Sequence, residues 1–168
     1  DWENRQRVYL QSVMYALDAF SSENILTTTI VPIGPQSVVL TEVHPGSVPS
    51  DTMYGMLYAL RALQDDQKYP HGPYKLQTVN VAKKVVAERA ADLARLLDIY
   101  TATVRDAQTG LVKTNLKLAA ARDCVTRQSS FYDNVVLWNT LALANQLGVR
   151  QAQSNELDAL RTKIISTY

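Results

Sequence analysis

Residues 109–148 have the sequence TGLVKTNLKLAAARDCVTRQSSFYDNVVLWNTLALANQLG, and they hold the densest group of polar side chains in this chain. The stretch opens with a turn at Thr109-Gly110 and passes through a polar segment. It closes with a helical pattern over residues 132–147 that stops at Gly148. We interpret the polar segment as a loop between two helices that carries the groups needed to bind a polar ligand.

The composition is that of an ordinary globular protein with about one domain in its 168 residues. A formal net charge of +1, from scattered basic and acidic residues, gives no indication of a nucleic-acid partner. The apolar runs are far shorter than the roughly 20 residues that span a bilayer, and no signal peptide is visible, so we expect no membrane partner. The single cysteine, Cys124, excludes an internal disulfide and leaves the redox compartment undecided.

The two ends of the sequence also carry information. The sequence begins at Asp1 without a methionine, and Trp2 already lies in a helical pattern. It stops at Tyr168, where another helical pattern is still running. A trimmed domain with helical ends would look like this, and so would a segment of a longer helical protein. Of these two alternatives, we expect that this chain is a segment of a longer helical protein.

Apolar residues recur at helical spacing in five segments. The predicted helices are 2–20, 51–63, 80–106, 132–147 and a last one after Ser154. Ser50 or Asp51 caps the second of these, and Asp106 to Gly110 ends the third. In the third helix, the charged residues Lys83, Lys84, Arg89, Asp92 and Arg95 are predicted to form a solvated face.

Residues 25–43 differ from the helical segments. Two runs rich in β-branched residues flank Pro32-Ile33-Gly34-Pro35, which predicts a β-hairpin with its turn at these four residues. Because an isolated hairpin is marginally stable in water, we expect it to lie on the helical body.

The alternation of helices with long loops and a short turn predicts stacked αα-hairpins, so the fold class is all-α with a small β-hairpin insertion. Residues 1–168 would form one helical-hairpin domain or a fragment of a larger one. Such hairpins bury their faces only against neighbours. We therefore expect a partner for this chain, either the remainder of a longer chain or a second copy.

Sugars are recognised by carboxylates, amides and guanidinium groups that bind hydroxyls, and by aromatic faces that cover the C–H patches. The central segment offers all of these groups in Arg122, Asp123, Arg127, Tyr132, Asp133, Asn134 and Trp138. The neighbouring Arg122 favours the ionised form of Asp123, which suits a base or a hydroxyl ligand. Asp133 has two explanations, because an acidic residue in the first turn of a helix is also stabilising for structural reasons alone.

Other kinds of site are not supported. No histidine lies near Cys124 to activate it as a nucleophile. Ser129 and Ser130 lack the context of a serine hydrolase. Neither His44 nor His71 has a partner at metal-ligand spacing, so we predict no metal and no cofactor.

The run Thr109-Gly110-Leu111, then Arg122-Asp123, then Ser130 to Asn134 and a Val/Leu/Trp-rich helix ending at Gly148 resembles the loop-plus-helix unit of six-hairpin glycosidases. These are the (α/α)6-toroid glycoside hydrolases of the glucoamylase, trehalase and glucosidase type. The resemblance covers about forty residues well and implies a fold of stacked hairpins. It also implies catalysis by two carboxylates, one a general acid and the other a base. It implies that Asp123 is the better candidate for a catalytic carboxylate, and that Arg122, Arg127, Tyr132, Asp133 and Asn134 contact the sugar or order the loop. From the residues themselves, we take Asp133 as a second catalytic candidate and Trp138 as a further substrate-binding candidate.

The sequence thus supports two hypotheses. The first is a glycoside hydrolase-like protein with a carbohydrate substrate. The second is a non-catalytic helical module that binds a protein or a carbohydrate. The first hypothesis requires the loops that carry polar and aromatic side chains to lie at one end of the molecule, around a shared pocket.

Overall fold

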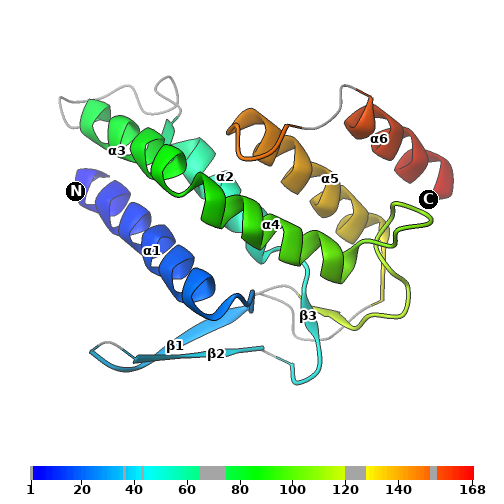
Figure 1. Cartoon of the computed structure of the whole chain (residues 1–168), viewed down its shortest axis with the longest axis horizontal. Helices are drawn as coiled ribbons and strands as arrows, with labels where there is room; N and C mark the ends of the chain where they lie inside the picture. Colours follow the sequence, from blue (N-terminus) through cyan, green and yellow to red (C-terminus); the bar gives the residue numbers. More distant parts are fainter. Residues whose placement is uncertain (1, 36, 43, 65–74, 120–127, 152–154) are drawn as a thin grey trace.

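The computed structural model describes residues 2–35, 37–42, 44–64, 75–119, 128–151 and 155–168. Most of these described residues lie in six α-helices (Figure 1). The helices are α1 (Trp2–Glu23), α2 (Thr52–Gln64), α3 (Lys75–Glu88), α4 (Ala90–Val104), α5 (Phe131–Gln146) and α6 (Glu156–Thr167). The prediction of a mostly helical protein with a small β-hairpin is therefore confirmed. No helix in this part of the chain is long and apolar enough to cross a bilayer.

The single helix predicted over residues 80–106 is wrong, because the structure has two helices there. Arg89 interrupts the helical geometry, with φ −108° and ψ 16°. Backbone hydrogen bonds still cross it, from Arg89 N to Val85 O and from Leu93 N to Arg89 O. The first of the two helices also begins earlier than predicted, at Lys75, since no Gly or Pro between Lys75 and Asn80 prevents helix formation.

At the break between α3 and α4, Arg89 makes an ionic contact with α1. The guanidinium group of Arg89 pairs with Asp18 on α1 and, at 2.7 Å, with Asp92. Arg95 binds the other oxygen of Asp92 at 2.6 Å and donates a hydrogen bond to the carbonyl oxygen of Ser21. The prediction that these three charged residues form a solvated face is therefore wrong, because they connect two helices.

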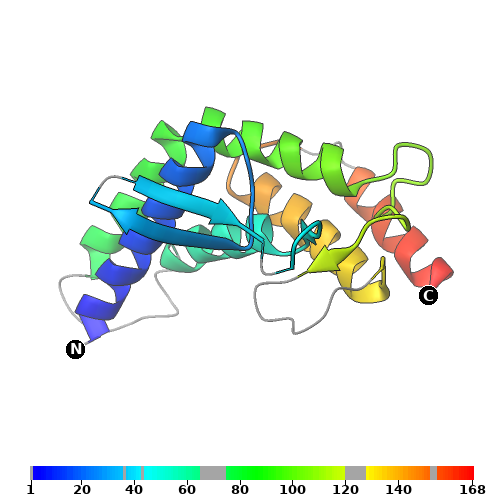
Figure 2. The ribbon, with the colours of Figure 1, turned by 90° about the horizontal axis from the view of Figure 1, so that it is seen from below.

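Two helices that start at the same end form the middle of the molecule. In Figures 1 and 2, α2 and α5 lie side by side and run in the same direction, whereas α1, α3, α4 and α6 run the opposite way. Leu17 on α1, Leu57 on α2, Leu97 on α4 and Leu137 on α5 are fully buried in one hydrophobic core. Helix α1 packs against α2, α2 also packs against α3 and α5, and α5 packs against α6.

The predicted β-hairpin is confirmed. Strand β1 (Thr29–Gly34) pairs antiparallel with β2 (Ser37–Thr41). Ile30 and Leu40 pack against the core, whereas Ile33 near the tip is exposed. The turn begins later than predicted, because Pro32 lies inside the strand, opposite Val38. A two-stranded ribbon has only edge strands, where a proline is tolerated.

Candidate functional site

The connections that lead into α2 and α5 meet at one end of the molecule. Strand β3 (Val48–Pro49) pairs parallel with β4 (Leu118–Ala119), with Val48 opposite Leu118. The backbone N–H groups of Val48 and Ser50 donate hydrogen bonds to Lys117 and Ala119, both at 2.8 Å. Figure 2 shows this pair between the β-hairpin and the start of α5. The segment before α2 is thereby joined to the segment that follows α4.

A buried tyrosine lies behind these two helix starts. The hydroxyl of Tyr100, on α4, donates a hydrogen bond to the carbonyl oxygen of Ser50 at 3.1 Å. Burial raises the pKa of Tyr100 far above its ordinary value. A hydrogen bond with Thr140 acts in the opposite direction, and the nearby charges of Asp133 and Asp51 raise the pKa further. Tyr100 is therefore a neutral hydrogen-bond donor that joins α4 to the segment just before α2.

This polar contact was not among the predictions from the sequence. Tyr100 falls on the apolar stripe of its helix, and the stripe alone predicts only that its ring is buried. A buried tyrosine nearly always has a hydrogen-bond partner for its hydroxyl, so the residue type indicates that a partner exists. The identity of that partner, a backbone carbonyl fifty residues earlier, depends on the fold.

Asp133 has the structural role that an acidic residue in the first turn of a helix commonly has. Ser130 is the N-cap of α5, and its hydroxyl accepts a hydrogen bond from the N–H of Asp133. The Asp133 carboxylate accepts hydrogen bonds from the Ser130 N–H at 3.2 Å and from the Ser130 hydroxyl at 2.7 Å. This is a capping box, and the side chain is only 1% exposed. Asp133 thus orders the helix start, and its catalytic role stays a prediction.

Asn134 also orders the loop. Its side-chain oxygen accepts a hydrogen bond from the N–H of Val112 at 2.8 Å. Its amide nitrogen lies within hydrogen-bond distance of Ser129 Oγ, Ser130 O and the hydroxyl of Tyr168. The residue is fully buried. One amide therefore connects the segment after α4, the cap of α5 and the end of α6.

The two aromatic candidates lie in different environments. Tyr132 is 50% exposed in the first turn of α5, so its ring is accessible to a ligand. Trp138 is partly buried, and its indole N–H donates a hydrogen bond to the carbonyl oxygen of Leu157 at 2.9 Å. Its ring lines a groove between α5 and α6 whose lining does not include Tyr132. The structure therefore places the two rings in separate surroundings.

The remaining predicted site residues, Arg122, Asp123 and Arg127, lie outside the described residues, as does Cys124. Their roles stay predictions from the sequence. Among the residues that the structure describes, no group of three or more His, Cys, Asp or Glu side chains could hold a metal ion. No protein-family model, curated protein or solved structure matches this chain.

Proposed function

We propose that this chain acts on glycosidic bonds as part of an (α/α)-toroid protein of the glycoside hydrolase type. The observation that supports the proposal is the alternation of helix direction along the chain, which leaves α2 and α5 parallel and in contact (Figure 1). α1 leads into α2, and α3 and α4 lead into α5, with α2 and α5 side by side (Figure 1). Further hairpins added in the same sense would close a ring and collect their connections at one end.

The connections that enter α2 and α5 are the long ones, and the sequence assigns site residues to the connection into α5 and to the first turns of α5. Their backbones are joined through β3 and β4. Asp51 and Asp133 lie at the starts of the two parallel helices, both close enough to Tyr100 to raise its pKa. Acidic side chains from two separate parts of the chain therefore lie near the buried Tyr100.

Within this proposal the residues have different tasks. Asp123 is the acid/base carboxylate, and Arg122 and Arg127 bind hydroxyl groups. Tyr132 offers an exposed ring on which a sugar can stack. Asp133 and Asn134 fix the start of α5, so that Tyr132 is held at this end. The second catalytic carboxylate would come from another connection at the same end.

Turnover tests the proposal directly. The protein encoded by the gene is assayed on a panel of aryl glycosides and α-linked disaccharides. We expect hydrolysis of at least one member, and a loss of at least about 100-fold in kcat for Asp123→Asn, because acid/base catalysis contributes about that much. Asp158→Asn, an exposed carboxylate on α6, is the matched control.

Two results would contradict the proposal. Unchanged turnover in Asp123→Asn would remove this residue from the mechanism. Saturable binding of a saccharide without hydrolysis would favour the alternative, a carbohydrate-binding module. The exposed ring of Tyr132 would fit that alternative equally well, because stacking requires no second carboxylate.

A further inference from the structure

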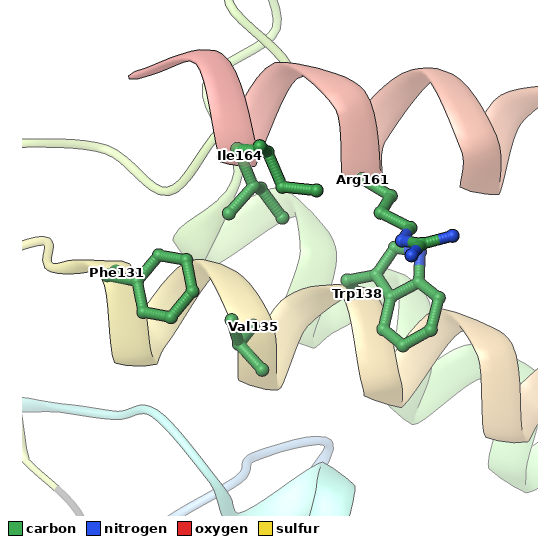
Figure 3. A pocket seen from close by; sticks show the side chains of 6 residues that line it. Phe131, Val135, Trp138, Arg161 and Ile164 are labelled. Carbon is green, nitrogen blue, oxygen red and sulfur yellow. The ribbon is translucent and has the colours of Figure 1, made fainter. Parts of the chain in front are cut away.

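An apolar groove lies between α5 and α6, away from the connections described above. One wall consists of Phe131, Val135 and Trp138 on α5, and the other of Arg161, Ile164 and Ile165 on α6 (Figure 3). The hollow measures about 190 Å³. Spacings of four and three residues place the three α5 side chains on one face over about 10 Å of helix.

Two of the lining apolar side chains remain open to solvent, whereas Ile164 is buried. Phe131 is 52% exposed and Ile165 is 65% exposed. The polar end of Trp138 is occupied by the carbonyl oxygen of Leu157, so the indole presents its apolar surface. A small-molecule site encloses most of its ligand, whereas this groove is shallow and follows two helices. Its shape suits the apolar face of a third helix.

Arg161 indicates the charge of the occupant. At three other contacts between elements an arginine faces a carboxylate: Arg89 with Asp18, Arg105 with Glu156, and Arg150 with Asp98. Arg161 borders the apolar groove, and it has no ion pair among the residues that the structure describes. An occupant with a carboxylate at this position would complete the same arrangement.

We propose that the groove between α5 and α6 binds a partner amphipathic helix. The helix presents apolar side chains at positions i, i+4 and i+7 to Phe131, Val135, Trp138 and Ile165, and an acidic side chain to Arg161. Tryptophan and arginine are the residues that most often dominate such interfaces. Trp138 was predicted from the sequence as a substrate-binding residue, and its place in this groove gives it a different task. The proposal does not depend on carbohydrate hydrolysis.

A display library of 14-residue helical peptides tests this proposal. The three apolar positions are fixed as leucine, and the flanking positions are randomised. We expect the wild-type protein to select Asp or Glu at one flanking position, and Arg161→Glu to select Lys or Arg there. For the selected peptide, Ile165→Asp should weaken binding at least about tenfold in fluorescence anisotropy, since a buried apolar contact is lost.

Ile33→Asp is the matched control, because Ile33 is equally exposed but lies on β1. It should bind the peptide as the wild type does. Ile165→Ala, with circular dichroism on every variant, separates lost binding from lost folding. The proposal is overturned if no peptide is selected, if selection shows no charge preference, or if Ile165→Asp leaves the affinity unchanged. Self-association of the chain that Ile165→Asp abolishes would assign the groove to a second copy and would also overturn it.

Discussion

At the scale of single residues, the loop before α5 depends on polar side chains that are buried. Sequence analysis identified Asp133 and Asn134 as polar groups at the start of a helix, and it gave a structural alternative for Asp133. It could not predict that Asn134 is fully buried, because polar residues in a first helical turn are usually exposed. Its partner, the N–H of Val112, lies 22 positions earlier in the chain, and only the fold brings the two together.

Replacing Asn134 by alanine should lower the free energy of unfolding by about 1–3 kcal/mol. The N–H of Val112 would lose its acceptor in a buried position, and that loss costs its full desolvation. Urea denaturation measures the change. Gln146→Ala, at the exposed end of the same helix, is the control and should stay within about 0.5 kcal/mol. An equally small effect for Asn134→Ala would show that the amide does not order the loop.

The capping box makes a second prediction at this scale. Ser130→Ala should cost about 1 kcal/mol, because the first turn of α5 loses its cap. Asp133→Asn weakens the reciprocal hydrogen bonds to Ser130. The two side chains interact directly, so the double variant should lose less than the sum of the single losses, by about 0.5 kcal/mol or more. Strict additivity in thermal or urea denaturation would contradict the capping box.

At the scale of elements, the junction between α3 and α4 differs most from the sequence prediction. Apolar residues keep helical spacing on both sides of Arg89, as Val85 and Leu93 illustrate, so periodicity alone predicts one helix. The interruption coincides with an ion pair to Asp18 on α1. Such a tertiary contact has no local sequence signal, whereas the helices themselves were predicted from their apolar stripes.

The pH dependence of stability tests this junction. Hydrogen bonds from Arg89 and then Arg95 hold the pKa of Asp92 below its ordinary value of 3.8. A lowered pKa in the folded state stabilises the protein above the unfolded-state value, and that stabilisation is lost as the pH falls through the folded-state value. Asp92→Asn should therefore be less stable than wild type at pH 7, by at most about 1 kcal/mol for these partly exposed groups. The difference should shrink below about pH 4.

Urea denaturation of both proteins between pH 7 and pH 2.5 provides the measurement. Asp158→Asn, at an exposed carboxylate in the first turn of α6, is the control; it removes only a weak helix-dipole contribution, so its difference from wild type should stay within about 0.5 kcal/mol at every pH. Because the groups are partly exposed, 1 M salt should reduce the effect of Asp92→Asn at pH 7. A difference between wild type and Asp92→Asn that does not change with pH would exclude this ionic contact.

At the scale of the whole molecule, the alternation of helices with loops that carry polar side chains was predictable from the sequence. The arrangement of these elements in space was not. A mostly helical chain follows from the positions of the apolar stripes and the turns at Gly110 and Gly148. The pairing of β3 with β4 involves two residues in each strand, too few to produce a periodic pattern. Yet this pair joins the segment before α2 to the segment that follows α4, and the proposed carbohydrate site depends on that contact.

The central claim, that carbohydrate binds at the end where α2 and α5 begin, is tested most directly by mapping amide chemical shifts during titration with α-linked disaccharides. If carbohydrate binds at this end, the amide chemical shifts of Ser50, Asp51 and Tyr132 should change and reach saturation. Residues 147–151, at the opposite end of α5, should not respond. Shifts confined to residues 147–151, or no shifts at millimolar saccharide, would contradict the account.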